Sequence, residues 1–188
     1  MINYGLPKSV TVNGTEYKIR SDFRAILDIV EALNDVNLNE QEKAYITLDI
    51  FYEDMEKIPI DDMQEAINEC FKFIEGGEAK PNKKAPKLVD WEKDFPLIIS
   101  PINAVAGREI RADEYCHWWT FIGYYNEISG DCTFAQIVRI RDKDARGVSL
   151  DKAERDWKMR NLDLVEMPSR YTDEEEEILK AWGGNNGE

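Results

Sequence analysis

The segment 76–90, GGEAKPNKKAPKLVD, most constrains what this chain can fold into. It holds two glycines, two prolines and four lysines with few apolar residues, a composition that cannot form a packed element. Apolar residues recur at helical spacing on both sides of it. We therefore expect a hairpin plus three-helix module over 1–75, a linker and hinge over 76–90, a helical module over 91–182, and a disordered tail over 183–188.

The first predicted element is a β-hairpin. Residues 9–12 and 15–19 flank Asn13-Gly14, a dipeptide suited to the positive φ angles of a tight hairpin turn. After residue 20 the apolar period changes from two to 3.6, which is typical of helices. The pattern predicts a mainly α fold, a bundle of about seven to eight helices with a short N-terminal β-hairpin.

Polar residues and prolines predict where these helices begin. Ser21 is an N-cap candidate, Asn39 with Glu42 forms a capping box, and a third helix starts near Pro59 and stops at Gly76-Gly77. Pro101, deep in the helix after Asp90, is expected to kink or split it. Further helix starts are predicted at Asp113, Thr133, Ser149 and Thr172.

Charge and composition exclude several classes of protein. There are 24 Lys and Arg against 38 Asp and Glu, giving a net charge of −14, so we expect no nucleic-acid partner. The absence of an apolar run of about 18 residues predicts no membrane span. Met1–Lys8 lacks a secretion-signal pattern, and Cys70, Cys116 and Cys132 suit free thiols in a reducing cytoplasm.

Residues that could support catalysis are few. Cys116 and His117 are neighbours on a predicted helix and point about 100° apart, so they share a metal poorly. The sequence has one His and no nucleophile or phosphate-loop motif, so we expect no enzyme activity, no metal site and no cofactor. The open alternative is a carboxylate-metal hydrolase. Its magnesium ligands would come from Asp61-Asp62, Asp142 with Asp144, and the Glu174–Glu177 run.

Trp118 and Trp119 are adjacent in a strongly aromatic predicted helix. Adjacent side chains diverge around a helix, so we expect one tryptophan to enter the core. The other is expected to meet a neighbouring helix or a partner.

Residues 87–143 carry a resemblance to a known family. They contain DWEKDFPLIISPINAVAG, EYCHWWTFIGYYNEI and TFAQIVRIRDK. This stretch resembles the tail assembly chaperones of siphophages and prophages of Gram-positive bacteria, encoded just upstream of the tape-measure gene. The matching residues that we expect to serve packing or interaction are His117, Trp118, Trp119, Phe121 and Arg141, with Asp22, Phe23 and Arg24 of an N-terminal D-F-R opening. Thr133 and Ile137, and Glu42-Lys43 of the second helix, also fit the family pattern.

The likeness spans residues about 20–165 and is most specific over 114–143. Two positions depart from the family pattern: Cys116 replaces a leucine before His117, and Glu109-Ile110-Arg111 replaces a more apolar approach. These departures bear on the contacts of that loop and are compatible with the same fold.

The resemblance implies a binding function. Such chaperones coat the tape-measure protein, keep it soluble and extended, and help to recruit tail-tube subunits. The implied partners are the tape-measure protein, the major tail-tube protein, a companion tail chaperone and further copies of this chain. The implied location is the bacterial host cytoplasm, with the chain absent from the mature virion. The alternative from another class is a structural virion component, such as a tail-completion or connector protein.

Overall fold

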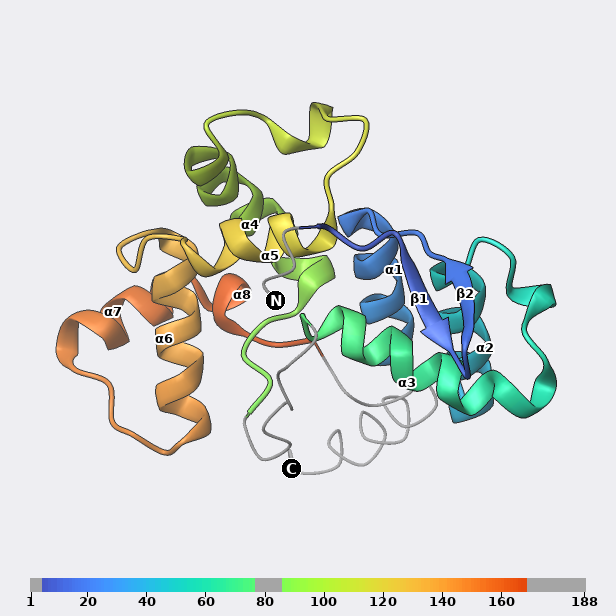
Figure 1. Cartoon of the computed structure of the whole chain (residues 1–188). Helices are drawn as coiled ribbons and strands as arrows, with labels where there is room; N and C mark the ends of the chain where they lie inside the picture. The colour runs from blue at the N-terminus through green and yellow to red at the C-terminus, as the bar shows by residue number, and fades with distance from the viewer. Residues whose placement is uncertain (1–4, 77–85, 169–188) are drawn as a thin grey trace, which may run out of the picture.

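The computed structural model describes residues 5–76 and 86–168. Within them the chain forms eight α-helices, three short 3₁₀ helices and one two-stranded antiparallel sheet, which confirms the predicted mainly helical fold with an N-terminal hairpin. In Figure 1 the hairpin and the helices of residues 23–74 lie on one side, those of residues 91–126 in the middle, and those of residues 133–165 on the other side.

The hairpin forms because its turn residues accept positive φ angles. Strands β1 (Ser9–Val12) and β2 (Thr15–Lys18) pair with Val12 opposite Thr15, and Asn13 and Gly14 turn with φ of 46° and 88°. Just after β2, Arg20 lies against the end of α2 (Glu40–Phe51), where it donates to the carbonyls of Asp49 and Tyr52 at 2.6 and 2.7 Å. A cation at the carboxyl end of a helix fixes the hairpin there.

The N-terminal helices begin at or near the predicted caps. Helix α1 (Phe23–Asn34) is capped by Asp22 and not by Ser21, whose hydroxyl instead lies 2.7 Å from that of Tyr115. Helix α2 (Glu40–Phe51) has the predicted Asn39–Glu42 capping box. Two 3₁₀ helices, η1 (Met55–Lys57) and η2 (Ile60–Asp62), lead into α3 (Met63–Ile74), so the turn after Pro59 is helical but α3 starts later than predicted.

The middle of the chain differs from the prediction at the start of the aromatic helix. Helix α4 (Trp91–Ala106), capped by Asp90 as predicted, continues through Pro101 without being split, and a kink there stays a prediction. After η3 (Ile110–Ala112), helix α5 (Trp118–Asn126) begins five residues later than Asp113. The reason is that His117 is extended and Cys116 O and Trp118 N bond to residues 21–23 of the chain, so a helix cannot begin earlier.

The last three helices surround a small second core. Helix α6 (Thr133–Ala145) is capped by the thiol of Cys132, and α7 (Lys152–Arg160) by Asp151, each one or two residues from the predicted cap. A break at Asn161 separates α7 from α8 (Leu162–Val165). The predicted helix after Thr172 lies outside the described residues.

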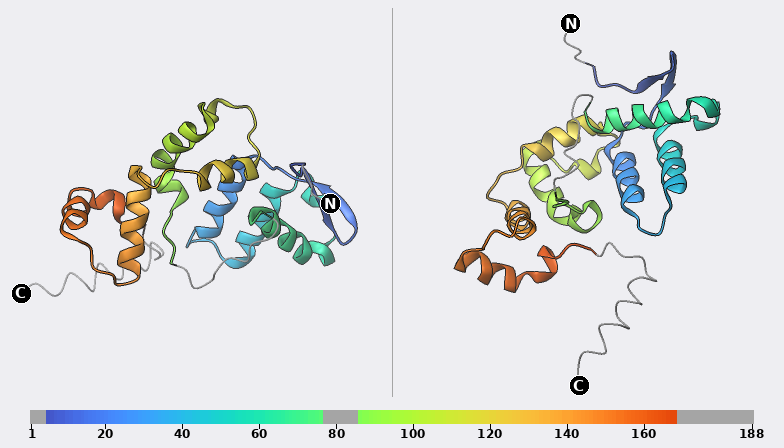
Figure 2. Two further views of the ribbon diagram at one scale, coloured as in Figure 1. Left: turned by 60° about the vertical axis from the view of Figure 1, so that its left-hand side comes forward. Right: turned by 90° about the horizontal axis from the view of Figure 1, so that it is seen from below.

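One hydrophobic core receives side chains from both sides of the predicted linker. Its members include Phe23, Ile26, Phe51 and Phe73 before the linker and Ile98, Ile102, Trp118 and Phe121 after it. The views in Figure 2 show α5 lying against the end of α3. Residues 77–85 of the linker and the tail 183–188 lie outside the described residues, and the division into two modules stays a prediction.

Candidate functional site

The N-terminal motif residues meet the aromatic helix at one junction. Asp22 and His117 form an isolated antiparallel bridge, in which Phe23 N donates to Cys116 O at 2.9 Å and Trp118 N donates to Ser21 O at 2.8 Å. The Asp22 carboxylate caps α1 and also accepts from Cys116 N at 2.8 Å. One aspartate therefore joins the start of α1 to the start of α5.

Arg24 extends this junction to the loop before α5. Its guanidinium pairs with Asp22 at 3.0 Å and donates to Asp113 O at 2.8 Å and Arg111 O at 3.3 Å. A planar fork can satisfy a carboxylate and backbone carbonyls together. The Asp22-Phe23-Arg24 opening therefore holds the loop that precedes the aromatic helix.

His117 is buried and its tautomer follows from its partners. Its Nδ1 accepts from Trp119 N at 3.0 Å, which caps α5, and its Nε2 lies 3.0 Å from Pro7 O, an acceptor. Nε2 therefore carries the proton in a neutral ring. Burial lowers the pKa of His117 below its ordinary value. The bond to Pro7 opposes this shift, and the positive charge of Lys8 adds to it.

This burial predicts a pH dependence of stability. The folded protein holds His117 with a lowered pKa, so the unfolded chain binds more protons as pH falls through about 6.5. Stability is expected to decrease from pH 7.5 to 5, with a slope of at most about 1.4 kcal/mol per pH unit from this group. Urea unfolding of His117→Asn, which keeps a capping oxygen, should show a shallower slope over that range. An unchanged slope would contradict the assignment.

The indole nitrogens of the two adjacent tryptophans both bond to α3. Trp118 Nε1 donates to Ile74 O and Trp119 Nε1 to Phe73 O, each at 2.8 Å, so the indoles satisfy two carbonyls in the last turn of that helix. Trp118 is 4% exposed in the core, whereas Trp119 is half-buried and stacks on Phe73 with centroids 5.5 Å apart. Phe121 stacks on Phe23 at 4.5 Å.

Arg141 makes a separate junction with the start of α4. Its guanidinium pairs with Asp94 at 2.6 and 3.0 Å, and the two side chains are 3% and 0% exposed. It also donates to the carbonyls of Leu88, Leu164 and Val165 at 2.7–2.9 Å. This one side chain therefore joins α4, α6 and α8. Asp94 was not among the predicted residues. An acid in the first turn of a helix is common because the helix dipole favours it, so its sequence position gives no sign of a buried ion pair.

Most of the motif side chains thus serve the interior. Phe23, His117, Trp118, Phe121 and Arg141 are at most 4% exposed, so they offer a partner almost no surface. The structure brings together seven of the eight predicted residues at the α1–α5 junction and leaves Arg141 at its own junction. Their role as an interaction surface stays a prediction, and a binding surface must be sought among exposed residues.

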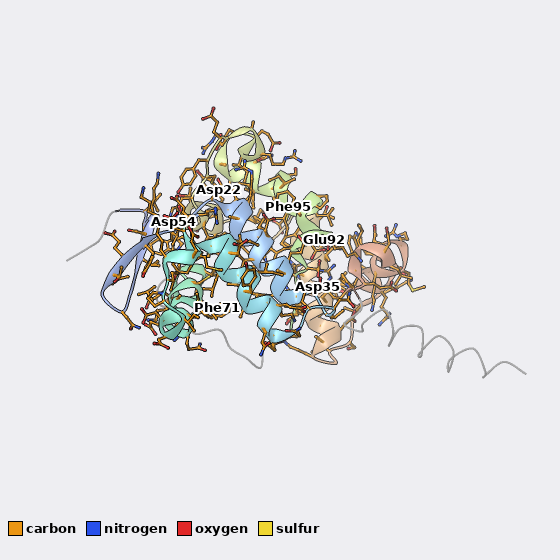
Figure 3. All side chains as sticks on the ribbon, turned by 90° about the vertical axis from the view of Figure 1, so that its right-hand side faces the viewer. Asp22, Asp35, Asp54, Phe71, Glu92 and Phe95 are labelled. Atoms are coloured by element: carbon orange, nitrogen blue, oxygen red, sulfur yellow. The ribbon has the colours of Figure 1, made fainter. Side chains whose placement is uncertain are left out.

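An apolar depression lies between α1 and α4. Its volume is about 440 Å³, and we call it the α1–α4 groove. Phe23, Leu27, Trp91 and Phe95 form its floor, and Asp28, Glu31, Glu92, Arg24 and Arg111 form its rim. Figure 3 shows Glu92 and Phe95 of α4 beside α1, whose ends are marked by Asp22 and Asp35. The sequence does not predict this groove. Helical periodicity identifies an apolar face, but it does not show whether a neighbouring helix covers that face completely.

Three of the carboxylates considered as metal ligands have other partners. Asp142 pairs with Arg146 at 2.8 Å, Asp144 pairs with Lys158 at 2.6 Å, and Asp62 accepts from Asn13 at 2.6 Å. Within residues 5–76 and 86–168, no three His, Cys, Asp or Glu side chains gather in a way that could hold a metal ion. The Glu174–Glu177 run lies outside the described residues.

The three cysteines are free thiols in the part of the chain that the structure describes: Cys70, Cys116 and Cys132. Burial raises the pKa of Cys70 to about 12. In the part of the chain that the structure describes, each helix is too short or too polar to cross a membrane.

Comparison with known proteins gives one family match. A family model described as "Bacteriophage Gp15 protein" matches residues 2–165 of the 188 residues. The matched range includes both junctions and the α1–α4 groove. Neither the curated proteins nor the solved structures contain a match to this chain.

Proposed function

Because the chain belongs to the bacteriophage Gp15 protein family, we propose that it acts during phage tail assembly, as a chaperone of the tape-measure protein. The chain would bind that protein in the host cytoplasm, keep it soluble and extended, help to recruit tail-tube subunits, and leave before the virion is complete. The family match supports a phage protein, and the likeness of residues 114–143 to tail assembly chaperones supports the more specific role.

The observation that carries this proposal is the α1–α4 groove, an open apolar surface on an acidic chain. Half-buried Leu27, Trp91 and Phe95 form a floor that a helical apolar stripe can fill. A long helical protein offers many such stripes, so several copies of this chain could bind along it. The net charge of −14 keeps the coated complex soluble and disfavours nucleic acid as the partner.

Co-expression tests the proposal. The phage's tape-measure protein is expressed alone and together with a tagged copy of this chain, and its soluble fraction and copurification are measured. We expect it to be insoluble alone, and soluble and copurified with several copies of this chain when both are present. A tape-measure protein that stays insoluble and unbound would contradict the proposal.

A further inference from the structure

We infer that the α1–α4 groove binds an amphipathic helix whose apolar stripe is flanked on both sides by lysine or arginine. This inference names the recognition surface and the partner chemistry, and it rests on the proposed function only for the identity of the natural partner. It is carried by the shape of the groove, its apolar floor and the placement of its acids.

The shape fits a helix of about three turns. Helix α1 has 12 residues, which gives a wall about 18 Å long at 1.5 Å per residue. A second depression of about 320 Å³ shares Glu31, Trp91 and Glu92 with the groove and extends it to Val36. Apolar anchors at i, i+3 or i+4, and i+7 of a bound helix would fit along such a floor.

The acidic side chains on the two walls of the groove favour basic residues on both sides of the bound helix's apolar stripe. Asp28 and Glu31 stand on the α1 wall and Glu92 on the α4 wall, and all three are exposed. No cation in the described part of the chain pairs with them, whereas Arg24 and Arg111 at one end already pair with Asp22 and Glu109. Acids on both walls complement basic residues on both sides of an apolar stripe.

The electrostatics of Glu31 agree with this placement. Desolvation, followed by the charges of Glu92, Asp28, Asp90 and Asp35, raises the pKa of Glu31. The charges that act on Glu31 are all negative, so the carboxylates around the groove repel one another. A basic helix would relieve that repulsion when it binds.

The same charges disfavour occupants from this chain. A second copy carries a net charge of −14, and residues 173–177 are five consecutive acids. Residues 79–87 of the predicted linker are basic but contain only alanine and proline as apolar residues, so they lack a stripe to fill the floor. A different, basic and amphipathic chain is the occupant that matches both floor and rim.

The test uses two labelled helical peptides with the same leucine stripe, one flanked by lysines and one by glutamates. Fluorescence anisotropy measures the binding of each to the full chain. We expect the lysine peptide to bind the wild-type chain, and D28K/E31K/E92K to weaken it by about tenfold or more. The glutamate peptide should gain affinity for that variant. Added salt should weaken binding of the lysine peptide.

The matched control is E56K/D61K/E127K, which makes the same change in net charge at exposed acids outside the groove. It should keep most of the affinity for the lysine peptide. The inference is overturned if the wild-type chain does not bind that peptide, or if both triple variants lose affinity equally. A groove variant that loses only self-association, seen by size exclusion, would also overturn it in favour of a second copy.

Co-expression separates this inference from the proposed function. If the wild-type chain solubilises the tape-measure protein but does not bind the lysine peptide, the groove inference fails and the chaperone function stands. If the wild-type chain binds the lysine peptide through the groove but does not solubilise the tape-measure protein, the function fails and the groove inference stands.

Discussion

Replacing Arg141 with methionine is expected to lower the free energy of unfolding by about 3–5 kcal/mol. The substitution leaves the Asp94 carboxylate, which is 0% exposed, without its cation. It also removes the donor from the carbonyls of Leu88, Leu164 and Val165, which join α8 and the segment before α4 to α6. Urea-induced unfolding followed by circular dichroism measures the change.

Two variants control this prediction. Arg146→Met removes a cation that is 66% exposed and pairs with Asp142 at the end of α6, so its cost should be below about 1 kcal/mol. Replacing both members of the buried pair, as R141M/D94L, should cost less than Arg141→Met alone because no charge is then left buried. If Arg141→Met costs no more than Arg146→Met, Arg141 does not hold these helices together.

Replacing Trp118 with alanine is expected to cost about 3–5 kcal/mol of stability. The indole is 4% exposed and packs against Trp91 and Phe121, and its Nε1 donates to Ile74 O at 2.8 Å. Its removal opens a cavity in the core and leaves a carbonyl at the end of α3 without a donor. Thermal and urea unfolding measure the loss.

The neighbouring residue supplies the comparison. Trp119→Phe keeps a ring to stack on Phe73 but removes the second ring of a half-buried indole and the Nε1 donor to Phe73 O, whose loss should cost about 1 kcal/mol. Trp119→Ala should fall between the two variants because this indole is half-buried. Equal losses for Trp118→Ala and Trp119→Phe would show that Trp118 is not a core residue.

The sequence was sufficient for the features that depend on local spacing. The hairpin follows from Asn13-Gly14, and the capping box from Asn39 and Glu42, because each is decided by residues within one turn. Predicted helix starts failed where a distant segment competes for the backbone. The segment before Trp118 is extended because it bonds to residues 21–23, nearly one hundred positions earlier, and local propensity carries no sign of that.

The candidate site shows the same limit. Resemblance identified Asp22, His117, Trp118 and Arg141 but not their role, since a motif does not say whether its residues face the interior or a partner. The pairing of Arg141 with Asp94 and the groove between α1 and α4 both depend on helices brought together by tertiary packing. Neither leaves a periodic or compositional signal in the sequence.

Mass spectrometry of phage tails at successive stages of assembly tests the chaperone role most directly. The chaperone role predicts that this chain accompanies the tape-measure protein in unfinished tails and is absent from purified virions. Finding the chain in fixed stoichiometry in purified virions would contradict that role and identify it as a structural component of the particle.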